Sequence, residues 1–230
     1  MKKVTQISIF SSLFILMLLA STSTFAQKIK PDADNAGLTL PAGFAALKVA
    51  DNVGRTRHIT VNKQGVIYAK LERLDNGKGI AVLKDTDGDG RAETKTTFAS
   101  YIGTGIAIKG NYLYAASNKE VFKYALNDNG DIVDENAAST LVTGLVDKGQ
   151  HNSKSITLDN AGNIYVNVGA PSNSCQEKDR TKGSMGMMPC PILDSAGGIW
   201  QFKVDQLNQT YATGVRYATG LRKDNINCKS

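Results

Sequence analysis

Residues 150–170 read QHNSKSITLDNAGNIYVNVGA. A polar corner precedes a short strand, and a turn rich in Asn and Gly separates that strand from a second one. The same order recurs in RHITVNKQGVIYA at residues 57–69 and, more loosely, in GTGIAIKGNYLYA at residues 103–115. A strand-turn-strand unit that returns every ~45–50 residues is typical of the blades of a β-propeller.

Each unit extends outward to four predicted strands. They cover residues 58–61, 66–71, 79–84 and 94–99, then 105–108, 112–116, 120–125 and 139–143, then 154–158, 163–168, 197–203 and 211–217. No long window shows a helical period. The sequence therefore predicts an all-β fold, a β-propeller of four-stranded blades, with about three blades within residues 40–222. A further strand over residues 44–50 is expected to seal the ring by completing the last blade.

The amino-terminal segment has the pattern of a secretory signal. Lys2 and Lys3 precede an apolar run, and small residues follow it up to Ala26. The run is shorter than the ~20 apolar residues that a membrane span needs. We therefore expect residues 1–26 to be a cleaved signal peptide, residues 27–39 to be flexible, and the mature chain to be periplasmic or secreted without a membrane span.

The carboxyl-terminal residues 223–230 depart from the repeat. They are polar, lack strand alternation and contain an odd cysteine, Cys228. Three blades do not close a ring, because propellers typically hold about four to eight. The sequence thus indicates the first half of a longer protein, truncated or shifted in frame, with exposed strand edges.

Charge and cysteines narrow the functional class. A formal net charge of +6 without a dense Lys/Arg run argues against nucleic-acid binding. Cys175 and Cys190 bracket a Gly- and Met-rich stretch, and a disulfide between them would close a short loop in an oxidising compartment. That loop belongs to the long connection from Pro171 to Gly198, which we expect to form a pocket wall or a flexible surface loop.

Polar residues stand where the innermost strands begin. Arg57, His58, Thr104, His151 and Arg222 all lie at or near these positions, so they are expected to converge on the propeller axis, where a ligand pocket would form. An imidazole there could act as a general base, although His151 could also cap a turn or face solvent. His58 is expected to be structural. Arg222 could pair with an anionic cofactor, or be a surface arginine.

Residues 85–93 read DTDGDGRAE. Asp85, Asp87, Asp89 and Glu93 offer hard oxygen ligands in a tight Gly-rich loop, which suits calcium. The loop differs from an EF-hand, because Thr96 stands where the bidentate Glu belongs and no helices flank it. A structural calcium site is predicted, and the alternative is an acidic turn without metal.

Several phrases together resemble the glucose/sorbosone dehydrogenase family of secreted quinoproteins, in particular its sorbosone or pyranose dehydrogenase type. They are residues 61–68, 83–90, 103–107, 163–173, 197–202 and 217–222, and the resemblance covers about residues 38–222. It implies a six-bladed propeller that binds pyrroloquinoline quinone (PQQ) with calcium on its axis. It further implies that His151 takes the proton of a sugar hydroxyl, that Arg222 contacts the quinone, and that Arg57 belongs more loosely to the cofactor's surroundings.

Two residues depart from the family pattern. Gln150 stands where the glucose-oxidising branch has a carboxylate before the His, and Lys223 follows Arg222 where Asn is expected. The predicted function is PQQ-dependent oxidation of a sugar hydroxyl or aldose, by a fragment of impaired activity; the sequence does not identify the electron acceptor. The alternatives are a lactonase-like propeller that uses calcium without quinone and a non-catalytic binding propeller.

Overall fold

The computed structural model describes residues 29–221, which fold into twelve strands in three four-stranded antiparallel sheets. The first sheet contains β1 (Thr56–Val61), β2 (Ile67–Asp75), β3 (Lys78–Lys84) and β4 (Thr94–Phe98); the second contains β5 (Ile106–Lys109), β6 (Tyr112–Ala116), β7 (Val121–Ala125) and β8 (Ser139–Val142); the third contains β9 (Ser155–Leu158), β10 (Asn163–Val168), β11 (Gly198–Lys203) and β12 (Val215–Thr219). In each sheet the spatial order of the strands follows the sequence. These sheets confirm the predicted four-stranded blades, and they do not close into a ring.

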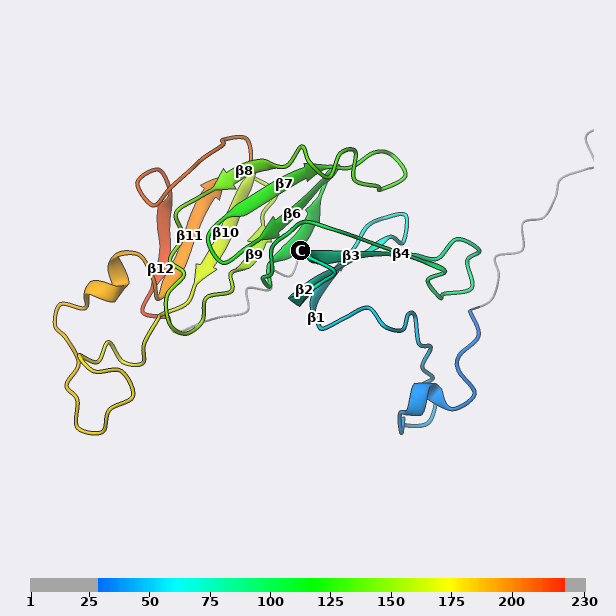
Figure 1. Cartoon of the computed structure of the whole chain (residues 1–230), viewed down its shortest axis with the longest axis horizontal. Coiled ribbons are helices and arrows are strands. Elements are labelled where there is room, and N and C mark those ends of the chain that lie inside the picture. The colour runs from blue at the N-terminus through cyan, green and yellow to red at the C-terminus, as the bar shows by residue number, and fades with distance from the viewer. Residues whose placement is uncertain (1–28, 222–230) are drawn as a thin grey trace, which may run out of the picture.

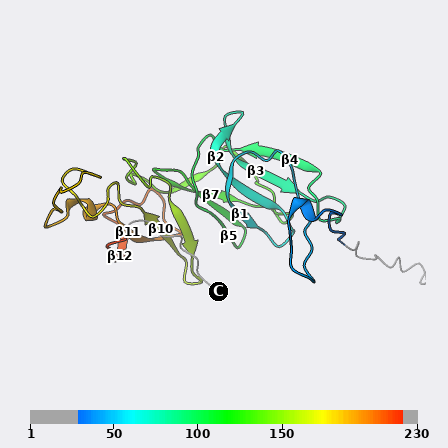
Figure 2. The ribbon, with the colours of Figure 1, turned by 90° about the horizontal axis from the view of Figure 1, so that it is seen from below.

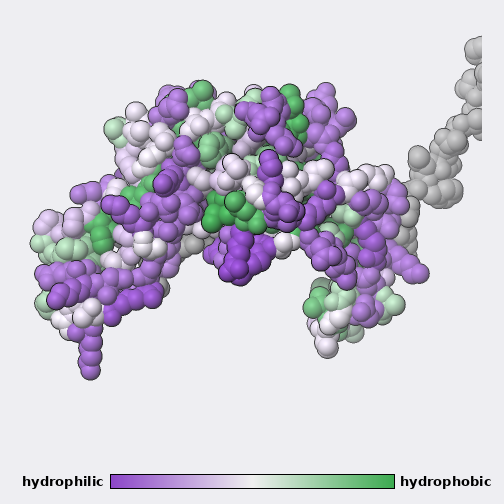
Figure 3. Space-filling view, viewed as in Figure 1, coloured by the Kyte–Doolittle hydropathy of each residue, from purple (hydrophilic) through white to green (hydrophobic). Residues whose placement is uncertain are grey.

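Helical structure within the described range is limited to two 3₁₀ turns, η1 (Asn35–Gly37) and η2 (Pro191–Asp194). No helix in residues 29–221 has the length and apolar character needed to cross a bilayer. The disulfide-containing connection and the amino-terminal segment project at opposite ends of the molecule (Figure 1). In the space-filling view both projections extend beyond the body of the molecule on the same side (Figure 3).

The recurring Asn/Gly turns are built by side chains that replace backbone hydrogen bonds. The side-chain oxygen of Asn62 accepts from the backbone N–H of Gln64 at 3.0 Å and of Val66 at 2.8 Å. In the third sheet Asp159 does the same for Ala161 at 2.8 Å and Asn163 at 2.9 Å. A short polar side chain that caps its own turn fixes where the hairpin reverses, so these turns set the register of β1–β2 and β9–β10.

The second sheet lies between the other two, and β5 contacts both β1 and β9 (Figure 2). One core joins the first and second sheets, and it includes Tyr68, Ile80, Phe98, Leu113 and Tyr124. The other joins the second and third sheets, and it includes Leu141, Val142, Ile164, Trp200 and Phe202. Apolar faces that pack sheet on sheet leave the ends of the innermost strands to carry polar groups.

The structure corrects the strand predicted over residues 44–50, which is absent. This segment instead packs along the acidic loop, where Val49 O accepts from the N–H of Ala92 at 2.8 Å and Lys48 O accepts from Arg91 Nη1 at 3.0 Å. A strand exists only beside a partner strand. The described part of the chain offers this segment a loop instead, so it remains irregular.

The last strand of the third sheet also begins later than predicted, at Val215 rather than at residue 211. Residues before it pair elsewhere: Gln209 forms a parallel bridge to Val142 of β8, and the side chain of Gln209 is buried. A turn then follows, in which Thr213 N–H and Gly214 N–H donate to Thr210 O at 3.0 and 2.9 Å. The bridge connects the second sheet to the third, and β12 begins only after the turn that follows it.

Candidate functional site

The starts of the innermost strands meet at one end of the sheets. A Cβ added at Gly105, just before β5, would lie 2.7 Å from the backbone oxygen of Lys154, just before β9. A Cβ added at Gly103 would lie 3.4 Å from Lys70 Cε, and Lys70 pairs in register with His58 near the start of β1. These approaches bring the residues just before β5 close to the residue before β9 and to the first sheet.

Buried oxygen atoms at this end lack hydrogen-bond partners within residues 29–221. They are Thr104 Oγ1, Asn152 Oδ1, Ser155 Oγ and, at the start of the long connection, Ser172 Oγ. A buried polar atom without a partner costs about 1–3 kcal/mol, so each such atom in a folded protein requires an explanation. A bound polar molecule that accepts from the hydroxyls and donates to the amide oxygen would supply one.

Lys154 holds the corner before β9 from inside. Its side chain is fully buried, and its ammonium donates to Val146 O at 2.8 Å and to Asn152 O. Two carbonyl oxygens solvate the cation in place of water, which a buried ammonium requires. The backbone on both sides of His151 is thereby tied to one side chain.

His151 sits in a strained, half-buried position of this corner. Its φ is +57°, in the left-handed region that non-glycine residues rarely adopt. Gly149, two residues earlier, also has a left-handed φ of +64°, and a Cβ there would lie 3.0 Å from Pro171 O. The corner therefore folds tightly against the start of the long connection, and strain of this kind persists where the surroundings fix the backbone.

The long connection from β10 to β11 returns to the same corner. Gln150 Nε2 donates to Asp179 Oδ2 at 2.6 Å, and Gln150 Oε1 accepts from Arg180 Nη2. Asp179 Oδ1 also accepts from the N–H of Asn173 at 2.9 Å. The sequence predicts a pocket wall or a surface loop here, but no pattern in it shows that two charged residues of the connection contact the residue before His151.

Cys175 and Cys190 form a disulfide across this connection, with Cα atoms 5.9 Å apart. A cavity of about 670 Å³ lies beside it. Its lining includes Ser172, Asn173, Met187, Met188, Leu193 and Leu221. A concave site with a few polar groups on an apolar wall is typical of small-molecule binding.

The other predicted site residues are placed differently. Arg57 is exposed in β1, and its guanidinium lies 3.6 Å from Glu72 Oε1, so it makes a surface ion pair. His58 is half-buried in the same strand, and its Nδ1 has no hydrogen-bond partner within the described range. Arg222 and Cys228 lie outside the described residues, as does the predicted signal peptide. Leu221, which precedes Arg222, lines the cavity and donates its N–H to Gly197 O at 2.9 Å.

A second buried lysine, Lys70, links the first two sheets. Its ammonium donates to Tyr101 O at 2.7 Å and to Gly79 O at 3.4 Å, and it lies 3.9 Å from the centre of the Tyr101 ring. Burial lowers the pKa of Lys70 to about 7. The contact of Lys70 with Tyr101 O has no signal in the sequence, because the two residues are 31 positions apart.

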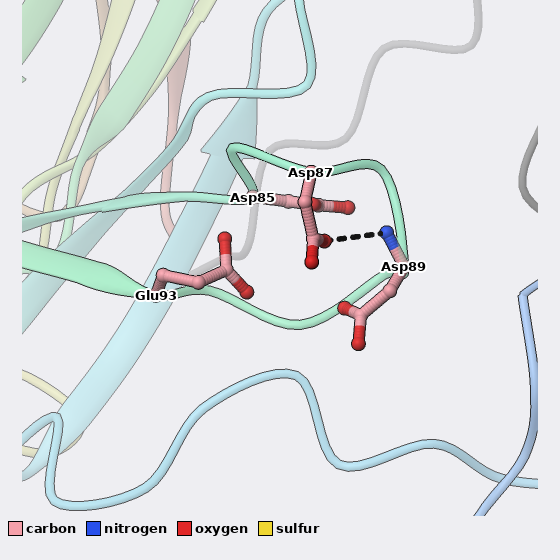
Figure 4. Close-up of side chains that lie close together, drawn as sticks. All are labelled: Asp85, Asp87, Asp89 and Glu93. Carbon is pink, nitrogen blue, oxygen red and sulfur yellow. Dashed lines mark hydrogen bonds between the residues drawn. The ribbon is translucent and has the colours of Figure 1, made fainter.

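The acidic loop lies between β3 and β4 (Figure 4). Because strands reverse direction in an antiparallel meander, it lies at the opposite end of the first sheet from the start of β1. Asp85, Asp87, Asp89 and Glu93 each bring a carboxylate oxygen within 4.8 Å of the others, and all but the half-buried Asp89 are exposed.

Backbone donors organise these carboxylates. Asp85 accepts from the N–H of Gly88 at 2.6 Å and of Gly90 at 2.7 Å. Burial alone would raise the pKa of Asp85, but the backbone hydrogen bonds together lower it by more, so its pKa lies below the ordinary value. The donors of Thr86 lower the pKa of Glu93. The loop thus gathers four carboxylate side chains around one point, which is a donor set of the kind that calcium prefers.

An ion pair attaches the amino-terminal segment to the acidic loop. Arg91 Nη2 lies 2.5 Å from Asp32 Oδ1, and the guanidinium of Arg91 lowers the pKa of Asp32. Residues 27–39, predicted to be flexible, therefore have at least one charged contact to the first sheet where the structure describes them.

Comparisons with known proteins agree with this architecture. A family model described as TrAA12-like matches residues 38–228. A search of the curated proteins found no match.

Two solved structures have similar folds. The iodide structure of a Trichoderma reesei enzyme of Carbohydrate-Active Enzymes Family AA12 is 19% identical, with a TM-score of 0.59 over 76% of this chain and 42% of that chain. The holo form of the pyranose dehydrogenase PQQ domain from Coprinopsis cinerea is 20% identical, with a TM-score of 0.60 over 81% of this chain and 44% of that chain. This chain therefore spans less than half the length of these two structures.

Proposed function

Since the chain belongs to the TrAA12-like family, we propose that it forms part of a PQQ-dependent oxidoreductase that oxidises a sugar. The family match agrees with the resemblance found in the sequence. One of its structural neighbours is the PQQ domain of a pyranose dehydrogenase, which supports the proposed cofactor and the sugar as substrate.

The observation that carries the proposal is the set of buried oxygens near His151 that have no hydrogen-bond partner among residues 29–221. Thr104 Oγ1 and Ser155 Oγ can each donate a hydrogen bond, and an anionic, oxygen-rich molecule such as PQQ would accept them. Asn152 Oδ1 can accept one in return. The residues present therefore fit the group, and they would hold it where β5 and β9 begin.

The cofactor, when bound, supplies the acceptor for the hydride that leaves the sugar carbon. The chain's own contribution is His151, whose imidazole would take the proton of the sugar hydroxyl. Lys154 would keep the backbone of this corner in place through its two carbonyl contacts.

We place two arginines in the cofactor's surroundings as proposals. Arg222 follows Leu221, a residue of the cavity wall, and its charge would balance negative charge on the quinone. Arg57 would have to leave Glu72 to take part.

The acidic loop is proposed to hold a structural calcium ion. Four carboxylates within 4.8 Å of one another repel, and a divalent cation would convert that repulsion into attraction. The ion would brace the loop between β3 and β4, at the far end from His151, and would take no part in the chemistry.

We also propose that the protein works in an exported compartment, periplasmic or extracellular. The Cys175–Cys190 disulfide supports this, because such bonds persist in oxidising environments. We further propose that the activity of this chain is impaired, so that it binds quinone weakly and turns over sugar slowly.

Titration of the chain with PQQ in the presence of calcium, followed by absorbance, tests the site. We expect saturable binding that weakens in a Thr104→Val/Ser155→Ala variant, which removes both hydroxyls with little change of shape.

Dye reduction with aldoses then tests the base. His151→Ala should keep quinone binding and lose turnover, while His58→Ala, the matched control, should keep both. No saturable binding by the wild-type chain would refute the proposal.

A further inference from the structure

The residue before His151 is held by two opposite charges from a distant part of the chain. Gln150 donates through Nε2 to Asp179, at 2.6 Å, and accepts through Oε1 from Arg180. A side-chain amide has one donor end and one acceptor end, so an anion at one end and a cation at the other allow a single orientation. Charge-assisted hydrogen bonds are also stronger than neutral ones.

The two charged residues are themselves fixed within the connection. Asp179 Oδ1 accepts from the N–H of Asn173 at 2.9 Å, and the N–H of Arg180 donates to Gln176 Oε1 at 3.1 Å. Their segment lies inside the loop that the Cys175–Cys190 disulfide closes, with a sequence separation of 15. The charged pair is thus presented by a short closed loop.

The backbone on both sides of Gln150 has an unusual conformation that must be held by contacts. Gly149 and His151 both have left-handed φ values, and Gly149 packs against Pro171 O at the start of the same connection. Left-handed backbone at His151 is intrinsically unfavourable, so outside contacts must hold it. The described contacts of Gln150 with Asp179 and Arg180 are available for that task.

We propose that Asp179 and Arg180 are positioning residues that act through Gln150 to orient the His151 imidazole. The disulfide loop then determines the direction of the group that would take the substrate proton. We call the contacts of Asp179 and Arg180 with Gln150 the clamp. Its role in catalysis rests on the proposed function, but its effect on the orientation of the His151 side chain does not.

The chain has two histidines, His58 and His151, which makes the orientation measurable. In protein labelled with ¹³C and ¹⁵N at histidine, each imidazole gives one set of ring signals, assigned by His58→Ala. We expect Asp179→Asn to move the His151 ring signals and to increase the fast motion of that ring in relaxation measurements. The His58 signals should stay in place.

A double variant that exchanges the donor and acceptor between positions 150 and 179 is expected to restore the orientation of His151. In the double variant Asp179→Asn/Gln150→Glu, the carboxylate introduced at position 150 accepts from Arg180 and from the amide introduced at position 179, so the clamp is restored with its polarity exchanged. We expect the His151 signals of this variant to regain wild-type order, whereas Gln150→Glu alone, which opposes two carboxylates, should not. Glu177→Gln, a charge removal in the same loop without a described contact to Gln150, is the matched control.

The result that overturns the inference is an unchanged His151 signal and unchanged ring motion in Asp179→Asn and in Arg180→Gln. Asp179 and Arg180 are exposed, so both variants are expected to fold, and the His58 signals report that they do. If the His151 signals respond to these variants as expected but the chain binds no PQQ, this inference stands and only the proposed function is refuted.

Discussion

Replacing Lys70 by Met should change how the stability of the protein depends on pH. Lys70 is fully buried, and its ammonium contacts two backbone oxygens and the Tyr101 ring. Burial lowers its pKa from 10.5 to about 7. Met has a similar length and no titrating group, so the variant removes the proton equilibrium while it keeps most of the packing.

The direction of the pH dependence follows from the protonation of Lys70 in the folded and in the unfolded chain. Between about pH 7 and 10.5 the unfolded chain keeps a proton on Lys70 that the folded chain has released, so the free energy of unfolding rises with pH. Below pH 7 both states are protonated, and the folded protein carries the full cost of the buried charge, about 5 kcal/mol for this shift. From about pH 7.5 to 9.5 the wild type should therefore gain about 2–3 kcal/mol relative to the variant.

Urea unfolding of the wild type and of Lys70→Met at about pH 7.5, 8.5 and 9.5 measures this difference. Other groups titrate in the same range, but they do so in both proteins and cancel in the comparison. Lys63→Met, at an exposed position, is the control and should follow the wild type throughout. Unfolding free energies of wild type and Lys70→Met that run parallel over this range would contradict the account of Lys70.

Three further outcomes are expected. Cys175→Ser/Cys190→Ser should lower the free energy of unfolding by about 3 kcal/mol, the loop-closure entropy of a separation of this size, and equal thermal midpoints would count against it. Calcium at about 100 times its dissociation constant should stabilise the wild type by about 2.7 kcal/mol, and Asp85→Asn/Asp87→Asn should abolish that gain in a thermal scan. Gly105→Ala should cost about 1–3 kcal/mol in urea unfolding, because the added methyl meets a backbone oxygen of the third sheet; an equally stable variant would argue against the close packing.

The blades can be predicted from the sequence because their information is local. The turns at Asn62 and Asp159 are capped by their own side chains, and the strands on either side follow at once. The strand over residues 44–50 and the start of β12 cannot be placed in this way. The first depends on a partner strand, and the second on Gln209, which pairs with Val142 of β8 rather than with its own sheet.

The site can be predicted only in part, for the same reason. His151 stands out as an imidazole in a polar corner that begins a strand, and this pattern is visible within a few residues. The contact of Asp179 with Gln150 spans 29 residues, and the contact of Lys70 with Tyr101 O spans 31. Neither pair has a spacing that a turn, strand or helix would impose, so nothing in the local pattern reveals it.

The distribution of unpaired polar atoms relates the fold to the proposed chemistry. Apolar side chains fill the two spaces between the sheets, so the fold meets its own packing needs there. The starts of β5 and β9 hold Thr104 and Ser155, whose buried hydroxyls have no partner within residues 29–221. Leaving them so costs stability that a Val or an Ala would not. Polar groups retained at such a cost are explained by a ligand that pairs with them, and quinone titration of the Thr104→Val/Ser155→Ala variant measures that pairing directly.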